Sequence, residues 1–376
     1  MKPFQLTRLP LIIRILGILM LFAGLHAEDL RAEDKDPDEP FEADQAYLKE
    51  HYTKYEYEIP MRDGVKLFTA VYTPKNQSFS YPILIHRTPY GIRPYGPDNY
   101  PAEPRGVLKY YAEERFIFVY QDVRGRNGSQ GEFVHVRPHL LLKSTPADID
   151  ESSDTYDTID WLIENVPNHN GSAGLMGISY PGFYSAAGMI DAHPALKCVS
   201  PQAPVTDWFI GDDFHHNGAF YLAHAFRFFQ RFGQQLEKPT RQSAEAFDYE
   251  TPNGYEFFLN IGPLYNINEK HFKNEILFWR ELMDHGSYDE FWSARDILPH
   301  LKDIKPAVMT VGGWIRCRGP LWPAQGLRIH GEKLARRLQH SGDGALGARR
   351  LAPRRRGAAR QCPFPPEDRA ILPRSH

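Results

Sequence analysis

The sequence predicts an α/β fold with a mostly parallel sheet, and two observations support that prediction. Short apolar stretches alternate with helical ones over residues 51–205, as in strand–helix–strand units. Ser179 stands in a tight turn between an apolar strand and a helix of small residues. Sites in such sheets form at the carboxyl ends of strands. The 376 residues suffice for one large core plus an inserted segment.

The strands are expected from their hydrophobic patterns. Residues 55–59 and 66–72 alternate on either side of the turn 61–64, which predicts a hairpin at a sheet edge. A helix is expected over 154–165, where Ile159, Leu162 and Ile163 share a face. Further strands are expected at 81–86, 116–120, 173–178, 197–200 and 306–311.

The chain changes character after the first part of the sheet domain. From Trp208 to about Ile297 it is aromatic and helical, without strand alternation. We therefore expect the sheet domain over 51–205, a helical cap over 206–300 that covers the site, and a returning strand within 301–314.

The N-terminus has the pattern of a secretory signal. Basic residues precede a short apolar run, which ends in small residues before an acidic pair at Glu28 and Asp29. This predicts a signal peptide over 1–27, then a flexible acidic leader over 28–50, and a secreted or periplasmic protein without a membrane anchor after cleavage. An uncleaved anchor is the alternative. The net charge of −3 shows no bias toward nucleic acid.

The turn at Ser179 has the features of a nucleophile elbow. Gly177 and Gly182 flank the serine, and small neighbours let strand and helix pack closely. The spacing is G-x-S-x-x-G rather than the commoner G-x-S-x-G, so a serine in an ordinary strand–helix turn remains the alternative. The sequence has no metal-ligand spacing, phosphate loop or dinucleotide fingerprint, and we expect no metal and no cofactor.

Five motifs occur in an order that resembles a known group. They are Met-Arg-Asp-Gly at 61–64, Thr-Pro-Tyr-Gly at 88–91, Asp-Val-Arg-Gly-Arg at 122–126, the elbow at 177–182, and Gly-Gly-Trp at 312–314. As a set they resemble the serine hydrolases of the X-Pro dipeptidyl-peptidase and cocaine-esterase group. The segment 211–219 looks most like the α-amino acid ester hydrolases within it. The resemblance implies an α/β-hydrolase sheet with an inserted helical cap.

The resemblance also implies roles for individual residues. Ser179 would attack the carbonyl and carry the acyl group. The backbone N–H of Tyr180 and the hydroxyl of Tyr90 would stabilise the oxyanion, although a packed loop tyrosine is the alternative for Tyr90. Asp213 would bind the α-ammonium group of the substrate, with Asp212 as the alternative assignment and helix capping as the structural one.

His215 and His216 stand beside these aspartates. We expect both to be structural rather than catalytic, since neither follows the end of a strand.

The sequence departs from the group after Trp314. The triad aspartate would stand two residues after Gly-Gly-Trp, where this chain has Arg316, and the later Gly-Pro-Trp-x-His-Gly stretch with the triad histidine is missing. Residues 315–376 are rich in arginine and contain no Tyr, Val, Thr, Asn or Met, so a sheet strand is not expected there. A basic disordered tail is one interpretation.

A frameshift is the sharper interpretation of residues 315–376. Back-translation with one base dropped after the codon of Trp314 permits Phe-Asp-Ala-Glu-Asp and, later, Gly-Pro-Trp-x-His-Gly. Both missing motifs thus recur in order, although the written residues largely determine the first base of each shifted codon. We therefore expect that this chain lacks the last sheet strand and the C-terminal β-sandwich domain which the resemblance implies, and that it is inactive.

The function expected of the parent protein is hydrolysis of α-amino acid esters, amides or short peptides. The alternatives are an X-Pro dipeptidyl-peptidase-like enzyme or a general carboxylesterase, and then a non-catalytic binding protein. A homo-oligomer of the full-length parent is left open, and no nucleic-acid partner is expected.

Overall fold

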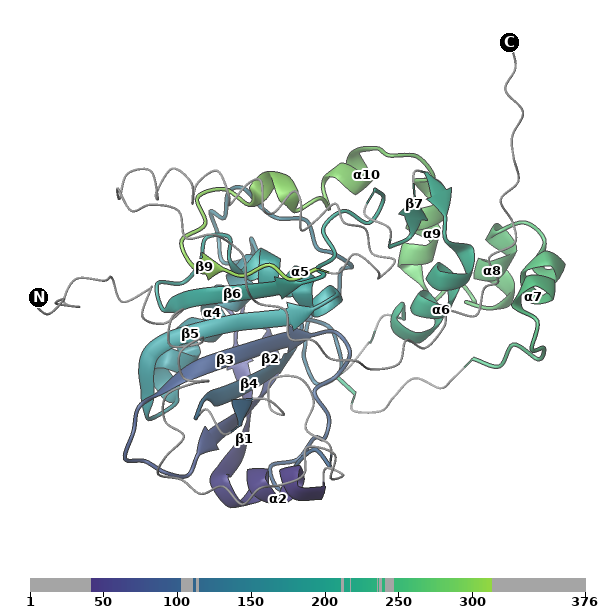
Figure 1. Ribbon diagram of the computed structural model, residues 1–376. Coiled ribbons are helices and arrows are strands. Elements are labelled where there is room, and N and C mark those ends of the chain that lie inside the picture. Colours follow the sequence, from purple (N-terminus) through teal and green to yellow (C-terminus); the bar gives the residue numbers. More distant parts are fainter. Residues whose placement is uncertain are drawn as a thin grey trace, which may run out of the picture. The chain divides into compact units, whose positions relative to one another are not determined.

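The computed structural model describes residues 42–102, 111–112, 115–210, 213–216, 218–234, 236, 239–240 and 247–312. The predicted signal peptide, Asp212 and Arg316 therefore lie outside the described residues, as does the whole of 315–376. A seven-stranded sheet in the order β1-β2-β4-β3-β5-β6-β9 forms the centre of the fold (Figure 1). Its strands are β1 (Tyr52–Pro60), β2 (Lys66–Pro74), β3 (Tyr81–Thr88), β4 (Ile117–Asp122), β5 (His169–Ile178), β6 (Leu196–Gln202) and β9 (Ala307–Val308).

The sheet is antiparallel at one edge and parallel over the rest. β2 pairs antiparallel with β1 and β4, whereas the pairs from β4 through β3, β5 and β6 to β9 are parallel. The predicted edge hairpin is confirmed, with the Met61 N–H donating to the Val65 carbonyl at 2.8 Å and Gly64 at φ 83° in the turn. The α/β class is confirmed as well. The strand predicted at 306–311 is shorter than expected, since only β9 and a bridge from Gln202 to Val311 form.

Helices α4 (Glu151–Asn165) and α5 (Tyr180–Gly188) pack against each other and against the sheet. α4 begins before the predicted residue 154 because Asp150 forms a capping box. The Asp150 Oδ1 accepts from the Ser153 N–H at 2.8 Å, and the Ser153 Oγ accepts from the Asp150 N–H at 2.9 Å.

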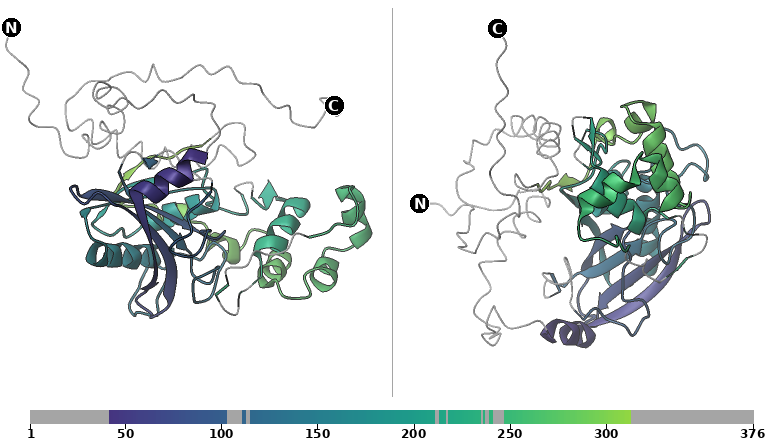
Figure 2. Two further views of the ribbon diagram at one scale, coloured as in Figure 1. Left: turned by 90° about the horizontal axis from the view of Figure 1, so that it is seen from below. Right: turned by 90° about the vertical axis from the view of Figure 1, so that its right-hand side faces the viewer.

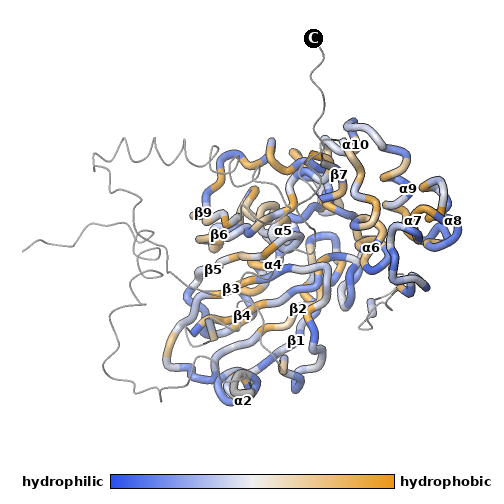
Figure 3. Tube along the Cα trace, turned by 45° about the vertical axis from the view of Figure 1, so that its right-hand side comes forward, coloured by the Kyte–Doolittle hydropathy of each residue, from blue (hydrophilic) through white to orange (hydrophobic). Residues whose placement is uncertain are grey.

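The sheet separates two hydrophobic clusters, as the alternation along β2 shows. Leu67 and Val71 belong to the cluster that contains α5 and the cap, whereas Phe68, Ala70 and Tyr72 belong to the other. Successive side chains of a strand point to opposite faces, so both faces of this sheet are covered. Hydrophobic residues are concentrated in the inner strands and α6, whereas α8 is mainly hydrophilic (Figure 3).

The C-terminal part of the predicted flexible leader is instead a helix, α2 (Glu42–His51), next to β1 (Figure 2). Leu48 is buried with Tyr52 in the second hydrophobic cluster. The side-chain amide of Gln45 also donates to the Tyr100 carbonyl at 2.8 Å. The prediction of a leader through residue 50 was wrong here because these contacts outweigh the acidic composition.

In its described residues, the stretch predicted to be a helical cap contains five helices and a short strand pair. The helices are α6 (Leu222–Phe232), α7 (Gly254–Ile261), α8 (Tyr265–Lys270), α9 (Leu277–Asp284) and α10 (Glu290–Ser293), followed by the 3-10 turn η1 (Leu298–His300). β7 (His215–His216) and β8 (Ala219–Phe220) pair antiparallel, which the sequence did not predict. Within the described residues, none of the helices has the length and hydrophobicity needed to cross a membrane.

Candidate active site

Ser179 occupies a strained turn between β5 and α5. Its backbone has φ 68° and ψ −122°, a conformation that non-glycine residues seldom adopt and that persists only where surrounding bonds hold it. Here the Ser179 N–H donates to the Gln202 carbonyl at 2.9 Å, and the Val205 N–H donates to the Ser179 carbonyl at 3.3 Å. The geometry is that of the predicted nucleophile elbow.

The two flanking glycines are required by close backbone approaches. A Cβ atom at Gly177 would lie 2.3 Å from the Pro181 carbonyl oxygen, and one at Gly182 would lie 2.8 Å from the Gln202 carbonyl oxygen. Gly182 therefore lets α5 approach the end of β6. The second contact explains why the glycine stands three residues after the serine in this elbow.

Tyr180 opens helix α5 with its ring in the core and its backbone beside Ser179. The ring is 2 % exposed, and its hydroxyl accepts from the Val136 N–H at 2.9 Å and lies 3.3 Å from the His135 Nδ1. Burial raises the pKa of the Tyr180 phenol and lowers that of His135 well below its ordinary value, so both are neutral. First-turn N–H groups of a helix have no intrahelical acceptor. The Tyr180 N–H is thus placed to donate beside Ser179.

Tyr90 lies in the loop that follows β3, and its half-buried ring lines the same pocket as Ser179. The ring centroid lies 4.8 Å from that of Phe232 at the end of α6. The carbonyl of Pro89, the residue before Tyr90, accepts a hydrogen bond from the Asn127 side chain at 3.1 Å. Arg126 donates to the carbonyl of Gln234, just after α6, at 3.0 Å. The Tyr90 loop is therefore held from both the sheet and the cap.

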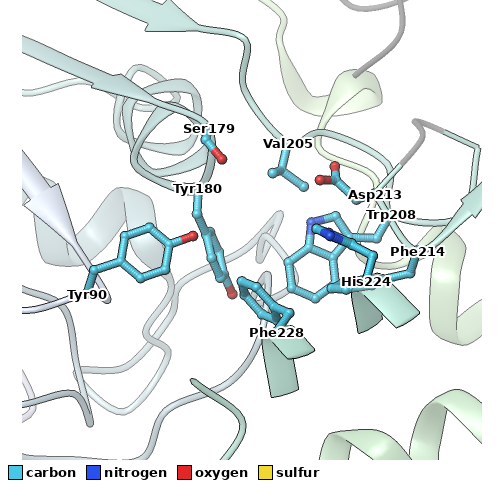
Figure 4. A pocket seen from close by; sticks show the side chains of 9 residues that line it. All are labelled: Tyr90, Ser179, Tyr180, Val205, Trp208, Asp213, Phe214, His224 and Phe228. Atoms are coloured by element: carbon cyan, nitrogen blue, oxygen red, sulfur yellow. The ribbon is translucent and has the colours of Figure 1, made fainter. Parts of the chain in front are cut away.

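A single pocket brings together the residues that the sequence placed far apart (Figure 4). It is lined by Tyr90, Ser179, Tyr180, Val205, Trp208, Asp213, Phe214, His224 and Phe228. Asp213 is only 6 % exposed. The pocket thus combines a hydroxyl nucleophile, a buried carboxylate and aromatic walls, and a buried carboxylate favours a cationic partner.

Some pocket residues were not found by the sequence analysis. Trp208 and His224 line the pocket, yet no motif singled them out. His224 lies on α6 two residues before Phe226, and helical periodicity alone does not indicate which exposed residue reaches a site. Asp212, the alternative to Asp213, lies outside the described part of the chain.

His215 does not line the pocket and is surrounded by aromatic rings. It is 3 % exposed, and its ring stacks on that of Phe209 with centroids 4.3 Å apart. Burial lowers the pKa of its imidazole. This environment agrees with the structural role expected for it. For His216 the backbone pairs with Ala219. Among the residues that the structure describes, no group of three or more His, Cys, Asp or Glu side chains could hold a metal ion.

The elbow, the sheet order and the inserted helices define the chain as an α/β-hydrolase. Sequence comparison agrees, because the family X-Pro dipeptidyl-peptidase (S15 family) matches residues 63–316. The chain belongs to that family, which comprises hydrolases of the serine esterase and peptidase type.

Individual relatives share the fold at moderate identity. An aminopeptidase from a marine sediment archaeon, Thaumarchaeota archaeon, superposes with a TM-score of 0.66 at 29% identity over 82% of this chain. A selenomethionine-labelled α-amino acid ester hydrolase superposes with a TM-score of 0.66 at 30% identity over 83%. The cocaine esterase of Rhodococcus sp. (strain MB1 Bresler) is 24% identical over 264 residues, which is 68% of this chain.

The chain spans about half the length of these relatives. It covers 50% of the aminopeptidase, 49% of the ester hydrolase and 42% of the cocaine esterase.

Proposed function

We propose that the parent enzyme hydrolyses esters or amides of α-amino acids through an acyl-enzyme on Ser179. The observation that carries the proposal is the buried carboxylate of Asp213 in the same pocket as the elbow serine. An α-amino acid ester has a carbonyl for the serine and an ammonium group for the carboxylate. The similarity to an aminopeptidase and to an α-amino acid ester hydrolase supports this assignment.

The reaction would proceed in two steps. The Ser179 Oγ attacks the carbonyl carbon and loses its proton to a base. The bond to the leaving alcohol or amine then breaks, and the leaving group takes up the proton. Water hydrolyses the acyl-enzyme and releases the amino acid. The Tyr180 N–H and the Tyr90 hydroxyl would donate to the oxyanion in both steps.

Asp213 would select substrates with a free α-amino group. A charge-assisted hydrogen bond between a buried carboxylate and an ammonium group is about twice as strong as a neutral one. Removing that charge should cost about 1.5–3 kcal/mol, or about 10- to 150-fold in kcat/KM.

The 376-residue chain itself would be inactive. The resemblance implies that the triad aspartate and histidine follow Trp314, but Arg316 stands at the aspartate position. The family match ends at residue 316, close to the position proposed for an extra base. Ser179 would then retain the elbow geometry but lack the general base that the triad supplies.

Nucleotide sequencing around codon 314, followed by an assay, tests the proposal. If an extra base is present, the protein translated in the shifted frame should hydrolyse phenylglycine methyl ester, and Ser179→Ala should lower its kcat by about 10⁴- to 10⁶-fold. The 376-residue chain should show no Ser179-dependent turnover. Codons that cannot encode the two motifs in the shifted frame would refute the frameshift, and turnover by the 376-residue chain would refute its inactivity.

Asp213→Asn distinguishes the competing hydrolase classes. In the shifted-frame protein this change should lower kcat/KM for phenylglycine methyl ester but leave phenylacetic acid methyl ester, which lacks the amine, unaffected. An equal effect on both esters would favour a general carboxylesterase. A preference for X-Pro dipeptide amides over single amino acid esters would favour a dipeptidyl-peptidase.

We also propose a secreted or periplasmic location, on the basis of the signal pattern in residues 1–27. Mass spectrometry of the purified parent should find an N-terminus near Glu28. An intact Met1 in the secreted fraction would contradict signal cleavage.

A further inference from the structure

Trp208 presents a buried hydrogen-bond donor to the pocket. Its side chain is 2 % exposed, and its indole Nε1 has no hydrogen-bond partner among the residues that the structure describes. Leaving a buried donor unpaired costs about 1–3 kcal/mol, so an unpaired donor that lines a pocket calls for an explanation. A ligand atom that accepts this hydrogen bond would supply one.

The indole is held firmly at this place. Its ring centroid lies 4.6 Å from that of Phe214 and 5.3 Å from that of Tyr180. The turn that carries it is held by Asp207, whose Oδ1 accepts from the Phe209 N–H at 2.8 Å. Figure 4 shows Trp208 on the same side of the pocket as Asp213 and His224, opposite Tyr90.

The other tryptophans of the cap provide a comparison. The Trp292 Nε1 donates to the His285 carbonyl at 2.7 Å. The Trp279 Nε1 also has no partner among the described residues, but Trp279 lies within the cap core and does not line the pocket. The combination of an unpaired donor and a pocket is found at Trp208.

We propose that the Trp208 indole N–H donates a hydrogen bond to the acyl side chain of the substrate, so that the enzyme prefers α-amino acids whose side chain carries a neutral hydrogen-bond acceptor. The inference rests on the proposed function. With the carbonyl at Ser179 and the ammonium group on Asp213, the side chain is the substituent of the α-carbon left to reach Trp208, which lines the same pocket. The ammonium group cannot accept this hydrogen bond because its nitrogen has no lone pair, and the carbonyl oxygen already accepts hydrogen bonds from the oxyanion donors.

Binding of four nearly isosteric amides to the 376-residue chain tests the proposal, and Ser179→Ala in that chain excludes any contribution from turnover. Phenylalanine amide has no acceptor on its ring, whereas 2-, 3- and 4-pyridylalanine amide each carry one. At about pH 6.5, where the α-ammonium group is charged and the pyridine ring is neutral, at least one pyridyl isomer should bind about 2- to 12-fold more tightly than phenylalanine amide, the gain expected of one neutral hydrogen bond. It should also shift the ¹⁵N-indole signal of Trp208, while those of Trp279 and Trp292 stay in place.

Trp208→Phe is the matched variant, because it keeps an aromatic ring and removes the donor. It should abolish the preference among the four amides, whatever its effect on the affinity they share. Equal affinities for the four amides before the substitution, or an unchanged preference after it, would overturn the proposal. If the variant does not fold, the amide comparison and the indole shift in the chain with Trp208 decide.

A separate binding comparison shows whether the proposed function itself is wrong. 3-Phenylpropionamide lacks the α-amino group and should bind at least tenfold more weakly than phenylalanine amide. If it binds equally well, and Asp213→Asn changes neither affinity, Asp213 does not bind an ammonium group. The premise of the Trp208 proposal would then be lost, whatever the pyridyl amides show.

Discussion

The sheet and the cap bury their side chains in different ways. Between the sheet and α4 the protein buries charges: Arg87 on β3 is fully buried, and its Nη1 lies 3.3 Å from the Glu151 carboxylate and 2.8 Å from the Thr155 hydroxyl. Arg124 pairs with Asp154 at 2.7 Å. The cap instead packs rings, and Phe226 contacts a set of aromatic side chains: Phe247, Phe257, Phe258 and Phe272.

This difference means that the sheet fixes the position of the reactive serine, whereas the cap supplies the apolar wall of the pocket. Ion pairs and hydrogen bonds are directional, so they hold the strands and α4 in one arrangement around the strained serine. Contacts between apolar rings tolerate changes of similar volume. The pocket wall formed by Phe214 and Phe228 can therefore differ between relatives without disturbing Ser179, which the sheet positions.

Two buried or half-buried arginines provide the strongest test of this contrast. Arg87→Met should lower the free energy of unfolding by about 3–5 kcal/mol, because it leaves the Glu151 carboxylate buried without this partner, although Asp154 keeps its ion pair with Arg124. Arg295 in the cap lies over the Phe291 ring at 3.7 Å, and Arg295→Met should cost only about 1 kcal/mol, since methionine keeps the ring contact. Urea unfolding of both variants measures the difference, and equal losses would contradict the contrast.

Glycine substitutions provide a second test with a smaller expected effect. Gly177→Ala should destabilise the protein by about 1–3 kcal/mol, since the new methyl group would meet the Pro181 carbonyl, which is backbone and cannot move aside as a flexible side chain can. A Cβ atom at Gly254, at the start of α7, would meet no atom outside its own helix within 4 Å. There Ala should be neutral or stabilising by up to about 1 kcal/mol. Thermal unfolding compares the two, and a neutral Gly177→Ala would show that the elbow is less tightly packed than these contacts imply.

The sheet was predictable from the sequence because its signals are local. Alternation predicted the hairpin of β1 and β2, and the small residues around Ser179 predicted the elbow. The helix α2 was missed, because a few apolar residues such as Leu48 anchor it in spite of its acidic composition. Composition describes the average of a segment, whereas packing depends on single side chains.

The pocket was only partly predictable. The roles of Tyr90, Tyr180 and Asp213 came from the resemblance, and the structure places all three with Ser179. Trp208 and His224 could not be found, because Trp208 lies in a turn without a periodic pattern and the helical periodicity around His224 does not show which partner the helix meets. The triad positions implied by the resemblance fall outside the described residues.

The contact between the loop that follows β6 and the C-terminal end of the cap offers the test with the smallest expected effect. The Ile297 N–H donates to the Thr206 carbonyl at 3.3 Å, and beside it the half-buried Asp296 accepts from the Leu298 N–H at 2.9 Å. Burial, and then the nearby Asp207 carboxylate, raise the pKa of Asp296 from 3.8 to about 6. The folded state therefore holds this proton more tightly than the unfolded state does.

Asp296 should thus contribute stability below about pH 4 and lose that contribution as the pH rises through about 6. Asp296→Asn keeps the acceptor for the Leu298 N–H and removes the charge. The variant should match the original protein at pH 4 and exceed it at pH 7 by less than about 1 kcal/mol, since solvent screens a half-exposed group. Urea unfolding at pH 4, 5, 6 and 7 measures the difference. If the free energies of unfolding of the two proteins changed in parallel with pH, the Asp296 charge would not oppose the packing of the cap on the sheet.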